Sequence, residues 1–199
     1  MPSIRSRRRL PHWEADDAIY FVTFRLSDSL PESVVERIQF ERHDIIATAR
    51  SAHRELSLSE HKRLKTLFGE HLDANLDRGA GQCFLANPAV ADVVAESLLH
   101  FHLKRYLLYA WCVMPNHVHV LFRLLLANDL AAVLHSWKSY SAKKANRLLL
   151  RSGEFWQREY FDHLVRSEDE FHRLVAYILQ NPEKAGLHDW RWCNSHLDS

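Results

Sequence analysis

Two histidines separated by one residue, His117 and His119, are the residues of this chain whose types and spacing point most directly to chemistry. They follow the turn-forming pair Pro115-Asn116 and open a β-patterned run that predicts a strand over residues 117–124. Successive side chains of a strand point to opposite faces, so the two imidazoles should share one face. By ligand type alone, such a pair would bind Zn²⁺ at least as readily as Mg²⁺.

A tyrosine and an asparagine could complete this metal site. Tyr177 and Asn181 are four residues apart at the end of a helix predicted over residues 168–180, so they share a helix face if the last turn extends to Asn181. Placed over the histidine strand, the amide oxygen and the imidazoles would hold a metal that polarises a phosphodiester. The Tyr177 oxygen would attack phosphorus, forming a covalent phosphotyrosine. Tyr140, on a basic helix, is the alternative nucleophile.

Clusters of basic residues predict contact with DNA phosphates, although a net charge of +1 does not by itself indicate a nucleic-acid-binding protein. The residues expected to contact DNA are Arg7, Arg8 and Arg9 of a basic N-terminal arm, Lys138, Lys143, Lys144 and Arg147 of one helix, and Arg158 in the segment WQREYFDH. Aromatic and basic residues of that segment could stack bases and hold phosphates. Its acidic residues Glu159 and Asp162 could orient a metal-binding histidine.

Length and composition place the chain among globular proteins with one core. A chain of 199 residues with 47% hydrophobic and 26% charged residues predicts a single domain. The three scattered cysteines form no disulfide or CxxC pattern, which suits a reducing cytoplasm. The sequence contains no signal-like segment, no apolar run long enough to span a bilayer and no glycine-rich phosphate loop. We therefore expect a cytoplasmic protein without membrane association or nucleotide cofactor.

The order of predicted elements favours an α+β fold with an antiparallel sheet covered by helices. Strands are expected over residues 19–26, 106–113, 117–124 and 160–166, and helices over residues 32–53, 58–77, 89–103, about 129–150 and 168–180. Residues 1–18 should form an arm, and the Asn181-Pro182 pair should end the last helix. His100 and His102 fall in a predicted helix, where they share no face, so we interpret them as structural.

Three blocks of sequence resemble the REP-associated tyrosine transposases, within the single-tyrosine HUH (His-hydrophobic-His) transposases. They are the strand at 19–26, the block VMPNHVHVLF, and FWQREYFDHLVRSEDEFHRLVAYILQNPEKAGL from residue 155 to 187. The resemblance implies a ferredoxin-like domain that cuts and rejoins single-stranded DNA beside hairpins, with Mg²⁺ or Mn²⁺ and a 5′-phosphotyrosine intermediate. It assigns His117, His119 and Asn181 as metal ligands and Tyr177 as nucleophile.

The resemblance also implies a nucleoid-associated protein acting as a monomer or homodimer. The helical segment at 32–77 departs from the compact family pattern and is interpreted as an insertion after the first strand. Two other functions remain open. One is a hairpin-DNA-binding protein of the same fold without catalysis, and the other is a zinc-dependent hydrolase built on the histidine pair, which would need an acidic ligand or base nearby.

Overall fold

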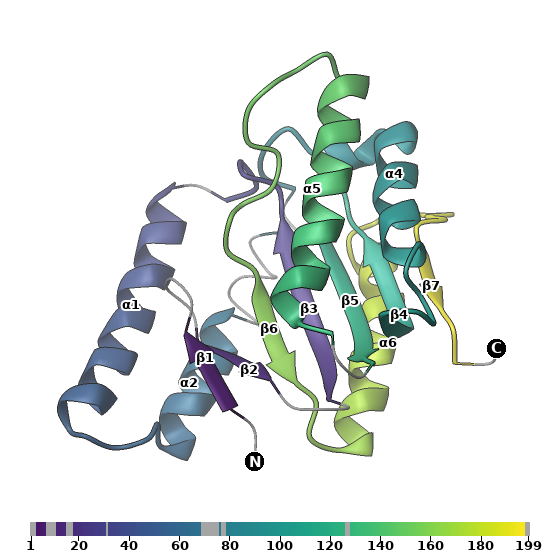
Figure 1. The fold of residues 1–199 in the computed structure, drawn as a ribbon. Helices are drawn as coiled ribbons and strands as arrows, with labels where there is room; N and C mark the ends of the chain where they lie inside the picture. The colour runs from purple at the N-terminus through teal and green to yellow at the C-terminus, as the bar shows by residue number, and fades with distance from the viewer. Residues whose placement is uncertain are drawn as a thin grey trace. The chain divides into compact units, whose positions relative to one another are not determined.

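The computed structural model describes residues 3–6, 11–14, 18–30, 32–68, 76, 79–125 and 128–197. They fall into two compact units, one of residues 1–27 with 83–199 and one of residues 28–82. The elements of the larger unit are β1 (Ser3–Ser6), β2 (Pro11–Glu14), β3 (Ile19–Arg25), the 3₁₀ helix η1 (Phe84–Ala86), α4 (Pro88–Leu99), β4 (Tyr106–Val113), β5 (His117–Leu124), α5 (Leu130–Leu148), β6 (Phe161–Leu164), α6 (Glu168–Lys184) and β7 (Cys193–Ser195) (Figure 1). The single-domain organisation of residues 1–199 stays a prediction.

The larger unit is built on a five-stranded antiparallel sheet with strand order β6-β3-β5-β4-β7. Without β7, the elements β3, α4, β4, β5, α5 and β6 follow one another as βαββαβ, and their strands lie in the order 4-1-3-2. This is the ferredoxin-like topology. The predicted α+β class with an antiparallel sheet is therefore confirmed.

Helices cover both faces of this sheet. Side chains that alternate along β3 and β5, such as Phe24 and Val120, pack with α4 and α5 on one face. Phe21 and Leu121 point to the opposite face, where they pack against α6. Figure 1 shows α4 and α5 in front of the sheet and α6 behind it. The sheet that contains the histidine strand β5 therefore has two helices on one face and one helix on the other.

Several details differ from the sequence predictions. The N-terminal arm contains a two-stranded antiparallel sheet of β1 and β2. Helix α4 ends at Leu99 instead of 103, and Leu103 takes a left-handed backbone with φ of 64°. His102 therefore lies outside the helix, and its Nδ1 accepts the Leu108 backbone N–H at 3.0 Å, which fits the structural role expected of it. Strand β7 was not predicted. Among the described residues, no helix is long and apolar enough to cross a membrane.

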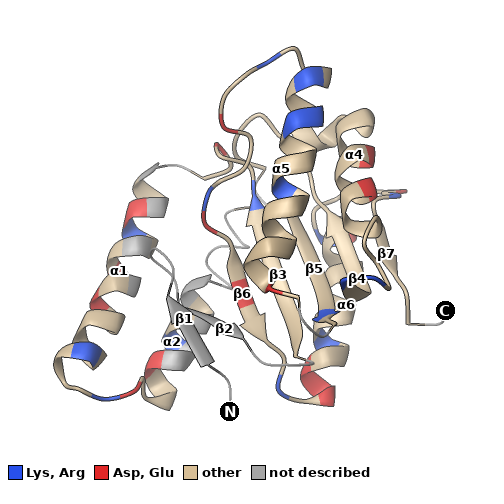
Figure 2. Cartoon of the chain, in the orientation of Figure 1, with Lys and Arg blue, Asp and Glu red and all other residues tan. Residues whose placement is uncertain are grey.

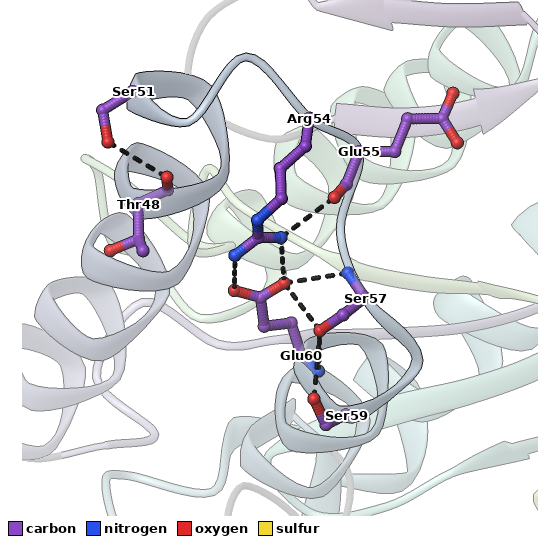
Figure 3. Close-up of polar contacts among 7 residues, drawn as sticks. All are labelled: Thr48, Ser51, Arg54, Glu55, Ser57, Ser59 and Glu60. Atoms are coloured by element: carbon purple, nitrogen blue, oxygen red, sulfur yellow. Dashed lines mark hydrogen bonds and ion pairs between the residues drawn. The ribbon is translucent and has the colours of Figure 1, made fainter.

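The smaller unit consists mainly of α1 (Glu32–Ser51) and α2 (Leu58–Phe68), which confirms two helices in this region. Residues 69–75 and 77 of the second predicted helix lie outside the described residues. A capping box begins α2: the Glu60 N–H donates to Ser57 Oγ at 3.3 Å, and the Ser57 N–H donates to the Glu60 carboxylate at 2.8 Å (Figure 3). Arg54 adds two hydrogen bonds to the same carboxylate, at 2.7 and 2.8 Å. These bonds hold the pKa of Glu60 far below its usual range and fix the turn between the helices.

Candidate functional site

The two histidines of β5 meet on the face of the sheet that α6 covers. His117 and His119 are both fully buried, and their Nε2 atoms lie 3.0 Å apart. Val118 and Val120 belong to the core on the opposite face, as the strand alternation predicts. Two ring nitrogens therefore converge on one point beneath α6.

The second nitrogen of each ring is held by a neighbouring polar side chain. His117 Nδ1 lies 2.7 Å from Asn116 Oδ1, and because an amide oxygen only accepts, Nδ1 carries the proton and Nε2 keeps its lone pair. His119 Nδ1 lies 2.8 Å from the hydroxyl of Thr23 on β3, which can either donate or accept. Such partners of a metal-ligating histidine fix its tautomer and ring orientation.

The environment keeps both rings neutral. Burial lowers the pKa of His119 to about 3. Burial, with a further contribution from His119, lowers the pKa of His117 well below its ordinary value. A neutral imidazole is the form that binds a metal ion. At neutral pH both histidines are therefore available as ligands.

Helix α6 extends further than the sequence predicts. Ser167 is its N-cap and accepts the Glu170 N–H at 3.2 Å. The helix does not end before Pro182 but runs through it to Lys184. A proline at this position leaves the carbonyl of Ile178 without its helical donor, and the Cys193 thiol of β7 donates to that carbonyl at 3.4 Å. This tertiary contact compensates for the missing N–H and keeps Asn181 in helical register with Tyr177.

Tyr177 lies over the histidine pair. Its hydroxyl is 3.5 Å from His119 Nε2, and its ring packs against the Phe21 ring edge-on at a centroid distance of 6.0 Å. The Nζ of Lys184, two turns along α6, is 5.5 Å from the centre of the Tyr177 ring. The Tyr177 hydroxyl therefore lies beside the histidine pair, with its ring held between Phe21 and Lys184.

Asn181, one helical turn after Tyr177, has a buried amide oxygen without a partner in the described part of the chain. The residue is only 1% exposed, and its Oδ1 has no hydrogen-bond partner among the described residues. An isolated buried amide oxygen is unfavourable unless a ligand satisfies it. Its position four residues after Tyr177 on α6 is the one that the sequence predicts for a metal ligand.

The residues present fit a divalent cation with mixed nitrogen and oxygen ligands. Two adjacent ligands of an octahedral ion, each about 2.1 Å from it, lie about 3 Å apart, and the two Nε2 atoms have a separation of 3.0 Å. The described residues contain no cluster of three His, Cys, Asp or Glu side chains suited to a metal. A third protein ligand would therefore be of another type, and the buried amide oxygen of Asn181 is a candidate.

The residues expected to contact DNA are more dispersed. Arg7, Arg8 and Arg9 lie outside the described residues. The four on α5 lie on the sheet face opposite the histidines, and Figure 2 shows basic residues gathered along the C-terminal part of this helix. Of these, Lys143 and Arg147 are exposed and Lys144 pairs with Glu96 at 3.3 Å. Arg158 is exposed and pairs with Glu154 at 3.2 Å.

Lys138 makes a different contact from the other basic residues of α5. Its ammonium donates to the backbone carbonyls of Gln157 and Arg158 at 2.7 and 2.8 Å. Burial lowers its pKa to about 8. Lys138 therefore anchors the segment that runs beside the end of β3, where the Gln157 N–H donates to the Arg25 carbonyl at 2.9 Å.

The structure separates the alternative nucleophile from the histidine pair. Tyr140 lies on α5, across the sheet from the histidines, and its hydroxyl donates to Glu96 at 2.9 Å. Asp162, opposite Val22 in the sheet register, also lies on that other face. Of the residues near the pair, sequence reasoning missed Thr23, Arg25 and Lys184. The alternation of β3 puts Thr23 and Arg25 on one face, but only the register with β5 places them beside the histidines.

Comparisons with known proteins agree with the resemblance seen in the sequence. Residues 89–181 match the family of IS200-like transposases. A REP-associated tyrosine transposase of Escherichia coli is 27% identical over 93 residues, and a provisionally named one of Haemophilus influenzae is 28% identical over 103 residues. The matched parts cover 45% of this chain in each case, and 54% and 58% of the two relatives. The similarity to this group is therefore confirmed over little more than half the length of these relatives.

A solved structure of a REP-associated tyrosine transposase bound to a REP hairpin covers 96% of this chain and 81% of that chain, with 18% identity and a TM-score of 0.45. This overlap is too distant to assign the fold, which follows from the strand order and helix placement described above.

Proposed function

We propose that this protein is a transposase that cleaves and rejoins single-stranded DNA beside hairpins through a 5′-phosphotyrosine intermediate. One observation carries the proposal: the Tyr177 hydroxyl lies 3.5 Å from His119 Nε2, with the unpartnered Oδ1 of Asn181 one helical turn away. A phenol oxygen beside a possible metal site suits nucleophilic attack on a phosphodiester. The similarity of residues 89–181 to IS200-like transposases supports the same reaction.

The reaction exchanges one phosphodiester bond for another. The Tyr177 oxygen attacks phosphorus and loses its proton, the bond from phosphorus to the 3′ oxygen breaks, and that oxygen leaves as a hydroxyl. In the reverse direction a 3′ hydroxyl attacks the phosphotyrosine and releases the phenol. The number of ester bonds is conserved, so rejoining requires no nucleotide hydrolysis. The Lys184 ammonium lies beside the Tyr177 ring, where it can stabilise negative charge on the phenol oxygen during attack.

His117, His119 and Asn181 would hold the divalent cation, which we propose to be Mg²⁺ or Mn²⁺. When bound, it would neutralise charge that develops on the phosphodiester oxygens. The chain's own contribution is to keep both imidazoles neutral and oriented, through burial and through Asn116 and Thr23.

A cleavage assay on single-stranded hairpin oligonucleotides, with Mg²⁺ or Mn²⁺, tests the proposal. Wild type is run on denaturing gels beside Tyr177→Phe, His117→Ala and Tyr140→Phe, and a covalent protein–DNA band is scored. Tyr140→Phe is the matched control, because Tyr140 is also a helical tyrosine near a lysine, Lys144, but lies on the other face of the sheet. We expect Tyr177→Phe and His117→Ala to abolish the band and Tyr140→Phe to retain it.

Other outcomes would favour other functions. Binding of hairpins by wild type without any covalent band, with either metal, would indicate a DNA-binding protein that lacks catalysis. One tightly held Zn²⁺ per chain, with hydrolysis that survives Tyr177→Phe, would indicate a zinc hydrolase. Loss of the band in Tyr140→Phe alone would show that the nucleophile is wrongly assigned.

A further inference from the structure

Arg25, the last residue of β3, lies on the same face of the sheet as the histidine pair. Phe21 and Thr23 of this strand contact His119, and strand alternation places Arg25 on the same side. Arg25 is also the direct register partner of His117. Side chains at such opposed positions begin about 5 Å apart. The Arg25 side chain therefore begins beside His117, at the edge of the candidate metal site, and its guanidinium lies within electrostatic reach of Glu159 and Lys138.

This cation has little to satisfy it within the chain. Arg25 is partly buried, and burial lowers the pKa of its guanidinium to about 10, with Glu159 nearby attracting the charge. No hydrogen bond or ion pair from its side chain occurs among the described residues, although a guanidinium has five N–H donors. Arg151 and Arg158, by contrast, donate to Glu154, through its backbone oxygen and its carboxylate. A partly desolvated arginine with open donors is a place for an anion.

We infer that Arg25 binds the phosphodiester at the cleavage site, donating to its non-bridging oxygens beside His117. This inference rests on the proposed function and names a contact of that same site. A guanidinium offers two parallel N–H groups to two phosphate oxygens, which fixes the orientation of the phosphate as well as attracting it. Glu159 attracts this charge without pairing with it, so the N–H donors of Arg25 stay open to a phosphate.

Single-phosphate substitution tests the contact without relying on cleavage. Hairpin oligonucleotides in which one linkage at a time is a neutral methylphosphonate are bound to Tyr177→Phe protein, with and without Arg25→Gln. If Arg25 holds the scissile phosphate, neutralising that linkage should weaken binding roughly tenfold or more in protein that keeps Arg25. In Arg25→Gln the same change should weaken binding less than about twofold, because that variant has already lost the charge-assisted contact. Every other linkage should show the same loss in both proteins.

Two further variants keep the test interpretable. Arg123→Gln removes an equal charge from the same face of the sheet, six residues from His117 and about 20 Å away along β5; it should show no coupling to the cleaved linkage. Arg25→Lys keeps the charge without the paired donors and covers the case in which Arg25→Gln does not fold. It should retain part of the coupling.

Additive losses at the cleaved linkage, or coupling to a different linkage, would overturn the assignment of Arg25. Failure of the proposed function looks different. In that case the protein would bind no hairpin at all, or wild type would form no covalent band, whatever residue stands at position 25.

Discussion

Thr23→Val tests the outer support of the metal site with a change of nearly equal size and shape. The substitution removes one hydroxyl, which lies 2.8 Å from His119 Nδ1 in a site where Thr23 is 3% exposed and His119 fully buried. Without metal, the two facing Nε2 atoms need one proton between them, and since His117 Nε2 holds a lone pair, that proton sits on His119 Nε2. His119 Nδ1 then accepts from the Thr23 hydroxyl.

Metal binding must reverse this arrangement. His119 has to present a lone pair at Nε2, so its proton moves to Nδ1 and the same hydroxyl becomes the acceptor. Valine can play neither part. A buried ring nitrogen left unsatisfied lowers the free energy of unfolding by about 1–3 kcal/mol, and loss of such an outer partner weakens metal affinity by about 10–100-fold.

Two measurements check these values. Mn²⁺ affinity is measured by calorimetry on DNA-free protein, and stability by urea unfolding with a chelator present. Thr23→Ser is the control, because it keeps the hydroxyl and loses only a methyl group. We expect Thr23→Val to lose affinity and Thr23→Ser to stay near wild type. Equal Mn²⁺ affinity in Thr23→Val and wild type would refute the proposed support of His119.

Three other changes probe the same site. The pKa of His119 is about 3 in the folded state and about 6.5 in the unfolded state, so below pH 6.5 the unfolded state takes up a proton that the folded state excludes. The metal-free protein should therefore lose up to about 1.4 kcal/mol of stability per pH unit from this residue as pH falls below 6.5, and nothing above it. Urea unfolding with a chelator should show a smaller dependence of stability on pH in His119→Gln. Asn181→Ala should weaken Mn²⁺ binding about tenfold without lowering metal-free stability, since its Oδ1 has no partner to lose; equal affinity would exclude it as a ligand. Lys184→Gln should slow formation of the covalent band, because the attacking phenol loses a nearby cation. An unchanged rate would show that Lys184 only packs on the ring.

The continuation of α6 through Pro182 shows how a local rule can be overridden. The residue before a proline disfavours the helical region, and the proline itself donates no hydrogen bond. Both are local effects, and the sequence therefore predicts an end at Asn181. In the structure, a thiol from β7 reaches the exposed carbonyl of Ile178. The local signal could not include a donor that arrives from 15 residues further along the chain.

The basic residues of α5 show a case in which the sequence gives the charge of the residues but not their position. Their charge is plain from the sequence, but the face of the sheet on which they lie is not. Lys138 donates to backbone carbonyls and Lys144 pairs with Glu96, so two of the four are already engaged within the chain. No local pattern in the sequence marks Arg25, a single arginine near a strand end, as a site residue. Register, which sequence alone does not fix, makes it the neighbour of His117.

The sequence by itself determined the parts of this protein that depend on short-range periodicity. Period-two alternation placed His117 and His119 on one face of a strand, and helical spacing placed Tyr177 and Asn181 on one face of a helix, because backbone geometry sets both patterns. Only the tertiary structure decided which faces meet. The strand order puts Thr23 and Arg25 beside the histidines, and the packing of α6 puts Tyr177 over them while leaving Tyr140 across the sheet. Such meetings depend on contacts between residues up to 96 positions apart, as between Thr23 and His119, which no local pattern encodes.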